Sequence, residues 1–279
     1  MWTAATLPLK THSELSYSDY CQAQQPSEDA VQQIQKDVPR TCESDVVAPH
    51  VLQRVLLAHA ARNVAVGYTQ GLNFVSASLL SALPPSSDEA DAFWLLCTIT
   101  ERLLPDYYIP SLIGVRTDGL VLEALLHEHE SLFDLPAIFE DAGFELGVIT
   151  PHWLLLGFSE TLPRDLTLRV WDLLFAFGSR VLLATALALL RCQAPRLRES
   201  SGFADLYALL RQPEKDAIIA SELLSAVLSE LHDLPATRVS VLRCQYRPRP
   251  APPKVPRRYR GKFRARGGRG HLSSLRTVD

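Results

Sequence analysis

Apolar residues recur every three or four positions along most of the chain, which is the spacing of an amphipathic helix. No alternating apolar and polar run typical of a strand competes with this pattern, and no motif repeats at a fixed period. The expected fold class is therefore all-α, a multi-helix domain with no substantial sheet. The pattern predicts helices over residues 28–38, 49–62, 72–83, 86–104, 117–132, 136–142, 151–161, 164–177, 180–192 and 213–232.

The first of these helices has clear signals at both ends. Ser27 precedes two acidic residues, as is typical of a helix N-terminus, and Ile34 belongs to its apolar face. Pro39 disfavours the helical conformation for Val38, so we expect the helix to stop there. Arg40 should then lie on an irregular turn just beyond the helix end.

A polar segment, GYTQGLNF at residues 67–74, separates two apolar stretches that are both expected to be helical. We expect Gln70 to project from a backbone turn at this junction. Gly71 would allow the turn to approach a neighbour closely, because glycine has no side chain. Tyr68 would brace the turn through packing and its hydroxyl, and Asn73 would bind backbone groups at the start of the next helix.

The composition changes after Leu234, where proline, arginine and glycine replace the apolar pattern. Such a sequence cannot bury enough surface to offset the entropy of ordering, so we expect a helical domain at 1–234 and a disordered tail at 235–279. Residues 243–279 hold 12 of the 28 basic residues and one of the 31 acidic ones. The preceding part of the chain therefore carries a net charge of −14.

Several classes of protein are disfavoured by the sequence. The longest apolar run, residues 181–190, is about half the roughly 20 residues that a membrane span needs, and the N-terminus does not resemble a secretory signal. The sequence contains no phosphate-binding GKS or GKT loop, no HExxH and no GxSxG. The cysteines lack the spacing of a zinc site, and their number is odd, so a reducing cytoplasmic location is expected. They are Cys21, Cys42, Cys97, Cys192 and Cys244.

Two short polar segments, IQKDVPRT at 34–41 and GYTQGLNF at 67–74, together resemble the signature motifs of TBC domains, the all-helical GTPase-activating modules for Rab GTPases. Their order and their separation of about 30 residues match the family. The motif IxxDxxR corresponds to Ile34, Asp37 and Arg40, and the motif YxQG corresponds to Tyr68, Gln70 and Gly71.

The resemblance extends from about Ser18 to Leu231. Residues 88–108 resemble the helix that follows YxQG in the family, and residues 168–190 resemble its WDxxF-and-glycine segment. The family normally begins with a helix that carries an arginine and then a tryptophan. Only Trp2 corresponds to that motif, so we expect this first helix to be missing.

The resemblance implies a role for each matched residue. Arg40 would be an arginine finger that stabilises charge on the phosphoryl oxygens of GTP, and Gln70 a second finger that orients the attacking water. Asp37 would hold the Arg40 guanidinium in a bidentate pose. The chain itself would need no cofactor, because GTP and Mg²⁺ would be carried by a Rab-family partner in its GTP state. The supporting residues would be Ile34, Asp37, Tyr68, Gly71 and Asn73.

Two other functions remain open from the sequence. The same fold could bind a Rab GTPase as a non-catalytic scaffold, particularly without its first helix. The tail at 243–279 contains RGKFRARGGRG, which resembles RGG-type segments and would give weak contact with RNA or with an anionic membrane. In that case the protein would be peripheral on endomembranes. The ordinary alternatives are a solvated turn arginine at Arg40 and a helix-capping side chain at Gln70.

Overall fold

The structure, a computed structural model, describes residues 2–23, 26–42, 47–84, 86–213 and 220–248. These residues form helices and turns, and the described ranges contain no strand, which confirms the expected all-α fold. Most of the expected basic tail, residues 249–279, lies outside the described residues.

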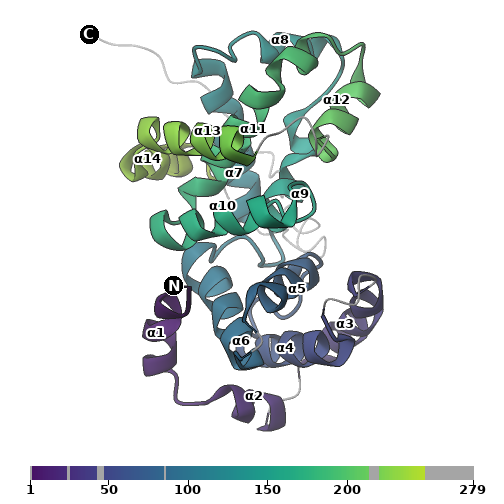
Figure 1. The fold of residues 1–279 in the computed structure, drawn as a ribbon, viewed down its shortest axis with the longest axis vertical. Helices are drawn as coiled ribbons and strands as arrows, with labels where there is room; N and C mark the ends of the chain where they lie inside the picture. Colours follow the sequence, from purple (N-terminus) through teal and green to yellow (C-terminus); the bar gives the residue numbers. More distant parts are fainter. Residues whose placement is uncertain (1, 24–25, 43–46, 85, 214–219, 249–279) are drawn as a thin grey trace, which may run out of the picture. The chain divides into compact units, whose positions relative to one another are not determined.

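The amino-terminal helices pack on one another, with α6 against α1, α4 and α5, and α3 against α4 and α5 (Figure 1). This arrangement brings the two polar motifs together, because one ends α3 and the other joins α4 to α5. The helices are α1 (Trp2–His12), α2 (Tyr17–Ala23), α3 (Glu28–Thr41), α4 (Pro49–Arg62), α5 (Leu72–Ala82) and α6 (Glu89–Thr98), followed by the π-helical turn η1 (Ile99–Leu103).

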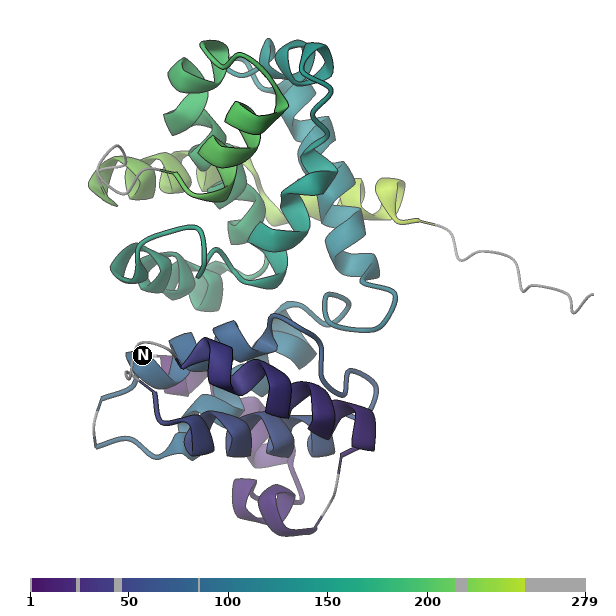
Figure 2. The same ribbon diagram turned by 90° about the vertical axis from the view of Figure 1, so that its right-hand side faces the viewer.

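The later helices surround α11, which contacts α7, α8, α10, α12 and α13 (Figure 2). Their bounds are α7 (Ile113–Glu128), α8 (Leu135–Asp141), the 3₁₀ turn η2 (Leu146–Val148), α9 (Thr150–Leu155), α10 (Arg164–Phe177), α11 (Arg180–Arg198), α12 (Phe203–Arg211), α13 (Ala220–Asp233) and α14 (Ala236–Tyr246).

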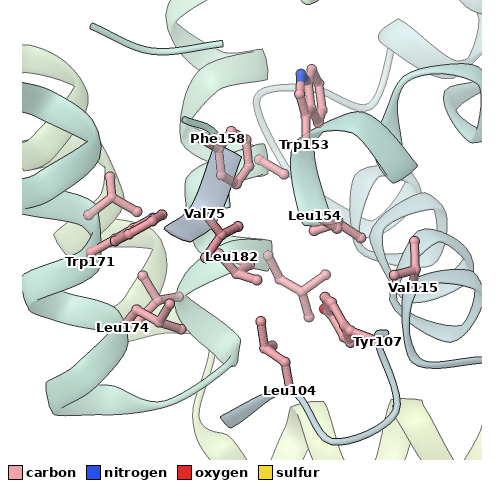
Figure 3. Packing of buried hydrophobic residues seen from close by; sticks show 14 of the residues in the cluster. Val75, Leu104, Tyr107, Val115, Trp153, Leu154, Phe158, Trp171, Leu174 and Leu182 are labelled. Atoms are coloured by element: carbon pink, nitrogen blue, oxygen red, sulfur yellow. The ribbon is translucent and has the colours of Figure 1, made fainter. Parts of the chain in front are cut away.

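The hydrophobic core is continuous through the helices, and α11 lies at its centre. All residues from Val181 to Leu190 are buried, so this long apolar run is a core helix, as expected. Figure 3 shows members of the core from different helices, including Val75 of α5, Trp171 of α10 and Leu182 of α11. Among the described residues, no helix combines the length and the apolar character needed to cross a membrane.

Trp2, the one residue matched to the family's first motif, begins a helix, α1, that packs on the domain. The Trp2 indole Nε1 donates to Asp172 Oδ1 of α10 at 2.7 Å, and its ring lies 5.2 Å from the ring of Phe175. Lys10 pairs with Asp91 of α6 at 2.8 Å. Residues 2–12 have little apolar periodicity of their own, so tertiary contacts of this kind hold the helix in place.

The end of α3 also differs from the expectation. The helix continues through Pro39 to Thr41, so Arg40 lies in its last turn and not beyond it. Pro39 costs the one hydrogen bond that its missing N–H would donate. The turn is kept by Thr41 Oγ1, which donates to the carbonyl of Asp37 at 2.7 Å, and by the N–H of Cys42, which donates to the carbonyl of Val38 at 3.2 Å.

The helical unit extends to Pro248, past the expected boundary at residue 234. From composition, residues 236–246 were predicted to belong to the disordered tail, but they form helix α14, which packs on the domain. Two arginines counted with the basic tail pair with acidic residues there: Arg243 with Asp118 and Arg247 with Asp106. Ion pairs of this kind carry no periodic sequence signal, which is why hydrophobic patterning missed the helix.

We predict that Gly114→Ala lowers the free energy of unfolding by about 1–3 kcal/mol, the usual cost of overpacking. A Cβ at this position in α7 would lie 2.6 Å from Tyr107 and 2.9 Å from the backbone of Asp106. Urea unfolding measures the change. Gly147→Ala is the control, because a Cβ there would meet nothing within 4 Å. Equal stability of the two variants would contradict the packing of the 104–112 loop on α7.

We predict that a fall in pH from about 6.5 to about 4 destabilises the protein partly through His59. This side chain is fully buried. Its pKa is lowered from 6.5 to about 4, mainly by burial and secondly by the positive charge of Arg62. The unfolded chain therefore binds the proton more tightly, and the free energy of unfolding should fall across this window by up to about 3 kcal/mol.

The measurement is urea unfolding at several pH values for the native chain and for His59→Gln. Glutamine cannot titrate but can still bond with Thr100, whose Oγ1 lies 2.9 Å from His59 Nε2. The variant should lose stability less steeply as pH falls. If the free energy of unfolding had the same pH dependence in both proteins, His59 would not be held neutral in the fold.

Candidate functional site

Arg40 lies at the C-terminal end of α3, where its guanidinium faces solvent. The side chain is 48% exposed, and its Nη2 lies 2.5 Å from Oδ1 of Asp37, one helical turn earlier. Asp37 itself is buried. A cation is favoured at the C-terminal end of a helix, and the i,i+3 spacing places both groups on one side of α3. Arg40 is therefore both oriented and accessible.

The second oxygen of Asp37 connects α3 to the loop between α4 and α5. Tyr68 donates its hydroxyl hydrogen to Asp37 Oδ2 at 2.6 Å. Burial, and then the hydrogen bond to Asp37, raise the pKa of Tyr68 well above its usual range, so the hydroxyl keeps its proton. One carboxylate thus binds a residue from each of the two sequence motifs.

Asn73, at the start of α5, makes a second connection between the same segments. Its Oδ1 accepts the backbone N–H of Gly71 at 3.0 Å, and its Nδ2 donates to Thr41 Oγ1 at 2.8 Å. The Thr41 hydroxyl in turn donates to the carbonyl of Asp37. Because Asn73 is fully buried, these bonds have no competition from water. The end of α3 and the turn before α5 are fixed to each other.

Gln70 projects from the tight turn that precedes α5. Gly71 has φ of +110°, a backbone conformation that favours glycine, and a Cβ on it would also be in tight contact with Leu156 Cδ2 at 3.0 Å. The Gln70 side chain is exposed, and its carboxamide makes no hydrogen bond with any residue in the part of the chain that the structure describes.

Ile34, the remaining motif residue, lies in the core and not at the surface. It is fully buried on α3, one turn before Asp37, where α3 packs against α4 and α5. Its contribution is therefore to anchor the helix that carries Arg40.

Arg40 and Gln70 line two adjoining hollows of the surface. The hollow beside Arg40 has a volume of about 340 Å³ and the one beside Gln70 about 260 Å³. Phe74 of α5 and Glu160 of the turn before α10 line both of them. The two exposed side chains therefore line neighbouring hollows of one surface, and we call these two hollows together the Arg40–Gln70 groove.

Other residues of the Arg40–Gln70 groove were not identified from the sequence. Arg164 lines the hollow beside Arg40, and Arg211 lines the hollow beside Gln70 in contact with His152. Burial and the charge of Arg211 lower the pKa of His152 to about 4, so this imidazole is neutral near pH 7. These residues come from α9, α10 and α12, and only the tertiary fold brings them to the motifs.

The Arg40–Gln70 groove presents a cation, the Arg40 guanidinium, and an amide, the Gln70 carboxamide, to any molecule that binds there. Among the described residues, no cluster of histidine, cysteine and acidic side chains is arranged to hold a metal ion. The exposed guanidinium of Arg40 can contact two oxygens of a phosphate group at once. The Gln70 carboxamide can both donate and accept hydrogen bonds, which is what positioning a water molecule requires.

Residues 5–198 match the RabGAP-TBC family, described as the Rab-GTPase-TBC domain, and the chain belongs to this family. The match begins earlier than the resemblance read from the sequence, because it includes most of α1. It ends at the last residue of α11, so α12, α13 and α14 lie outside it.

Two curated relatives are about one-third identical to the chain over the aligned residues. Small G protein signaling modulator 3 of Bos taurus is 35% identical over 252 residues, covering 87% of this chain and 33% of the relative. Growth hormone-regulated TBC protein 1 of Homo sapiens is 31% identical over 202 residues, covering 72% and 59%. The chain thus spans about a third of the length of the first of these relatives.

Two solved structures have a similar fold. The Chlamydomonas flagellar RabGAP TBC domain superposes with a TM-score of 0.68 at 25% identity, covering 82% of this chain and 75% of that one. The Ypt/Rab-GAP domain of Gyp1p has a TM-score of 0.63 at 21% identity, covering 88% and 81%, and supports the fold alone.

We predict that Asn73→Ala lowers the free energy of unfolding by about 2–4 kcal/mol, because it leaves the buried Gly71 N–H without its partner and breaks the bond to Thr41. Urea unfolding measures the change, and Gln33→Ala on the exposed side of α3 is the control, expected within about 0.5 kcal/mol of the native chain. A loss as small as that of the control would contradict the role of Asn73 in joining α3 to α5.

Proposed function

We propose that the protein is a GTPase-activating protein that inserts Arg40 and Gln70 into the active site of a GTP-bound Rab-family GTPase. Arg40 stabilises the charge that develops on the transferred phosphoryl group, and Gln70 orients the attacking water. The nucleotide and Mg²⁺ belong to the partner. Membership of the Rab-GTPase-TBC family supports the choice of partner class.

The observation that carries the proposal is the shared carboxylate of Asp37. It contacts Arg40 from the first motif and Tyr68 from the second, at 2.5 and 2.6 Å. Phosphoryl transfer by a GTPase needs positioning and electrostatic stabilisation more than covalent chemistry from the activating protein. This connection fixes the two backbone segments that carry Arg40 and Gln70, so their relative position does not have to be set at the moment of reaction.

The groove supports the same interpretation. Phe74 lies between the Arg40 and Gln70 hollows and offers an apolar contact where a partner would bind. Arg164 adds a second guanidinium beside Arg40. An arginine supplied in trans raises the rate of GTP hydrolysis by about 10³ to 10⁵ in characterised systems, which sets the scale of the expected activity.

The direct test is single-turnover GTP hydrolysis by a panel of GTP-loaded Rab GTPases with increasing amounts of the protein. We expect acceleration of at least one member, and a loss of at least about a hundredfold in both Arg40→Ala and Gln70→Ala. Arg40→Lys should not restore the rate, because an ammonium group cannot bind two phosphate oxygens in the same geometry.

The matched control is Arg169→Ala. Arg169 forms the same kind of i,i+3 pair, with Asp172 at 3.5 Å on α10, but does not line either hollow. This variant should accelerate hydrolysis like the native chain. Full activity in Arg40→Ala or Gln70→Ala would disprove the finger assignment. Binding to GTP-loaded Rab without acceleration would instead identify a non-catalytic scaffold.

A further inference from the structure

Helix α14 contacts the domain through both apolar and charged side chains. Val239 is its buried residue. Two arginines of the helix, and Arg247 directly after it, pair with acidic residues on α7 or just before it. The pairs are Arg238 with Glu128, Arg243 with Asp118 and Arg247 with Asp106, each at 2.6 to 2.7 Å. This helix lies after residue 198, outside the range that matches the family.

The middle pair differs from the other two in its burial. The Asp118 side chain is 1% exposed, compared with 59% for Glu128 and 38% for Asp106. Arg243 binds both Asp118 oxygens, through Nε at 2.7 Å and Nη2 at 2.6 Å. Its Nη1 donates to Ser179 Oγ at 2.8 Å, which adds the start of α11 to the contact. A bidentate, buried pair is far more restrictive than an exposed one.

Asp118 also fixes the loop of residues 104–112 that precedes α7. Tyr107, buried in this loop, donates its hydroxyl hydrogen to the carboxylate that Arg243 binds. The N–H of Gly114 donates to the carbonyl of Asp106 at 2.9 Å, and the loop lies too close to Gly114 for any side chain there. The loop is therefore connected, through the Tyr107 hydroxyl, to the carboxylate of the Arg243–Asp118 pair.

The next residue of the loop, Tyr108, binds the residue before Gln70 and a residue that lines the hollow beside Gln70. The carbonyl of Tyr108 accepts the Thr69 hydroxyl at 2.7 Å, and the Tyr108 hydroxyl donates to the carbonyl of Leu155 at 3.0 Å. Thr69 precedes Gln70 in the chain, and Leu155 lines the hollow beside it. A continuous set of contacts thus runs from Arg243 through the loop to the backbone that presents Gln70.

We propose that Arg243 is a positioning residue for Gln70, acting through Asp118, the 104–112 loop and Thr69. The proposal rests on the proposed function, and it assigns to α14, outside the matched family range, a part in the reaction on the partner. It requires no contact between Arg243 and the GTPase. Loss of Arg243 should loosen the turn at Gln70 and leave the surface that binds the partner in place.

The experiment compares Arg243→Ala, Arg243→Lys and Thr69→Val with the control Arg238→Ala, whose partner Glu128 is exposed. Single-turnover hydrolysis is measured over a range of protein concentrations on a Rab GTPase that the native chain activates. We expect the maximal rate to fall by about threefold to thirtyfold in Arg243→Ala and in Thr69→Val. The half-saturating concentration should stay within about twofold of the native value, because ground-state binding is retained.

The combination of variants distinguishes positioning from general damage. If Arg243 acts through Thr69, the double variant Arg243→Ala with Thr69→Val should have a maximal rate no lower than that of the slower single variant. Arg243→Lys should be faster than Arg243→Ala. Arg243→Ala leaves the Asp118 carboxylate buried without its cation and risks unfolding, so circular dichroism checks each variant at the assay temperature. If it unfolds, Arg243→Lys and Thr69→Val carry the test. Native maximal rates in these two variants would overturn the proposal.

Hydrogen exchange gives a readout that does not depend on GTPase activation. The backbone N–H of Gly71 is bound by Asn73, and that of Leu72 donates to the carbonyl of Thr69 at 3.1 Å. We expect both amides to exchange faster in Arg243→Lys than in Arg238→Ala. If the native chain activates no Rab GTPase, the proposed function fails. Separately, equal exchange of these two amides in Arg243→Lys and Arg238→Ala would overturn the positioning role of Arg243.

Discussion

The carboxylate of Asp37 is the group on which the candidate site depends. It is buried, and each of its oxygens binds a residue from a different part of the chain: Arg40 on the same helix and Tyr68 on the loop before α5. A buried carboxylate is costly unless its oxygens are paired, so the two motifs stabilise the fold only when they meet. The contact that completes the helical packing is therefore the same contact that orients the exposed guanidinium.

Other parts of the fold fix the segments on either side of the Asp37 contact. Asn73 joins α3 to α5 from within the core, and Gly71 forces the turn that presents Gln70. Later helices form the opposite side of the groove, and Glu160 lines both of its hollows. The backbone segments that carry Arg40 and Gln70 are thus held in place by buried hydrogen bonds, which is the kind of support that a preorganised site needs.

Sequence predicted the fold well where helix signals are local. Helix 164–177 agrees with the structure at both ends, because proline before it and glycine after it mark the boundaries. The sequence-based prediction was wrong where tertiary or side-chain contacts determine the helix bounds. Trp2 holds α1 in place although residues 2–12 have little apolar periodicity. Thr41 bonds to the carbonyl of Asp37 and so keeps Pro39 within α3. The motif residues were found from their family pattern, but Glu160 had no signal, since its nearness to the motifs is a product of the whole fold.

The proposed function requires Arg40 and Gln70 to complete the hydrolytic centre of a GTPase together. The most direct measurement is the affinity of the protein for a Rab GTPase loaded with GDP and aluminium fluoride, which mimics the phosphoryl group in transfer, compared with GDP alone. We expect tight binding only with the mimic, and its loss in both Arg40→Ala and Gln70→Ala, because transition-state contacts are the ones removed. Unchanged affinity of either variant for the mimic-loaded GTPase would contradict the account.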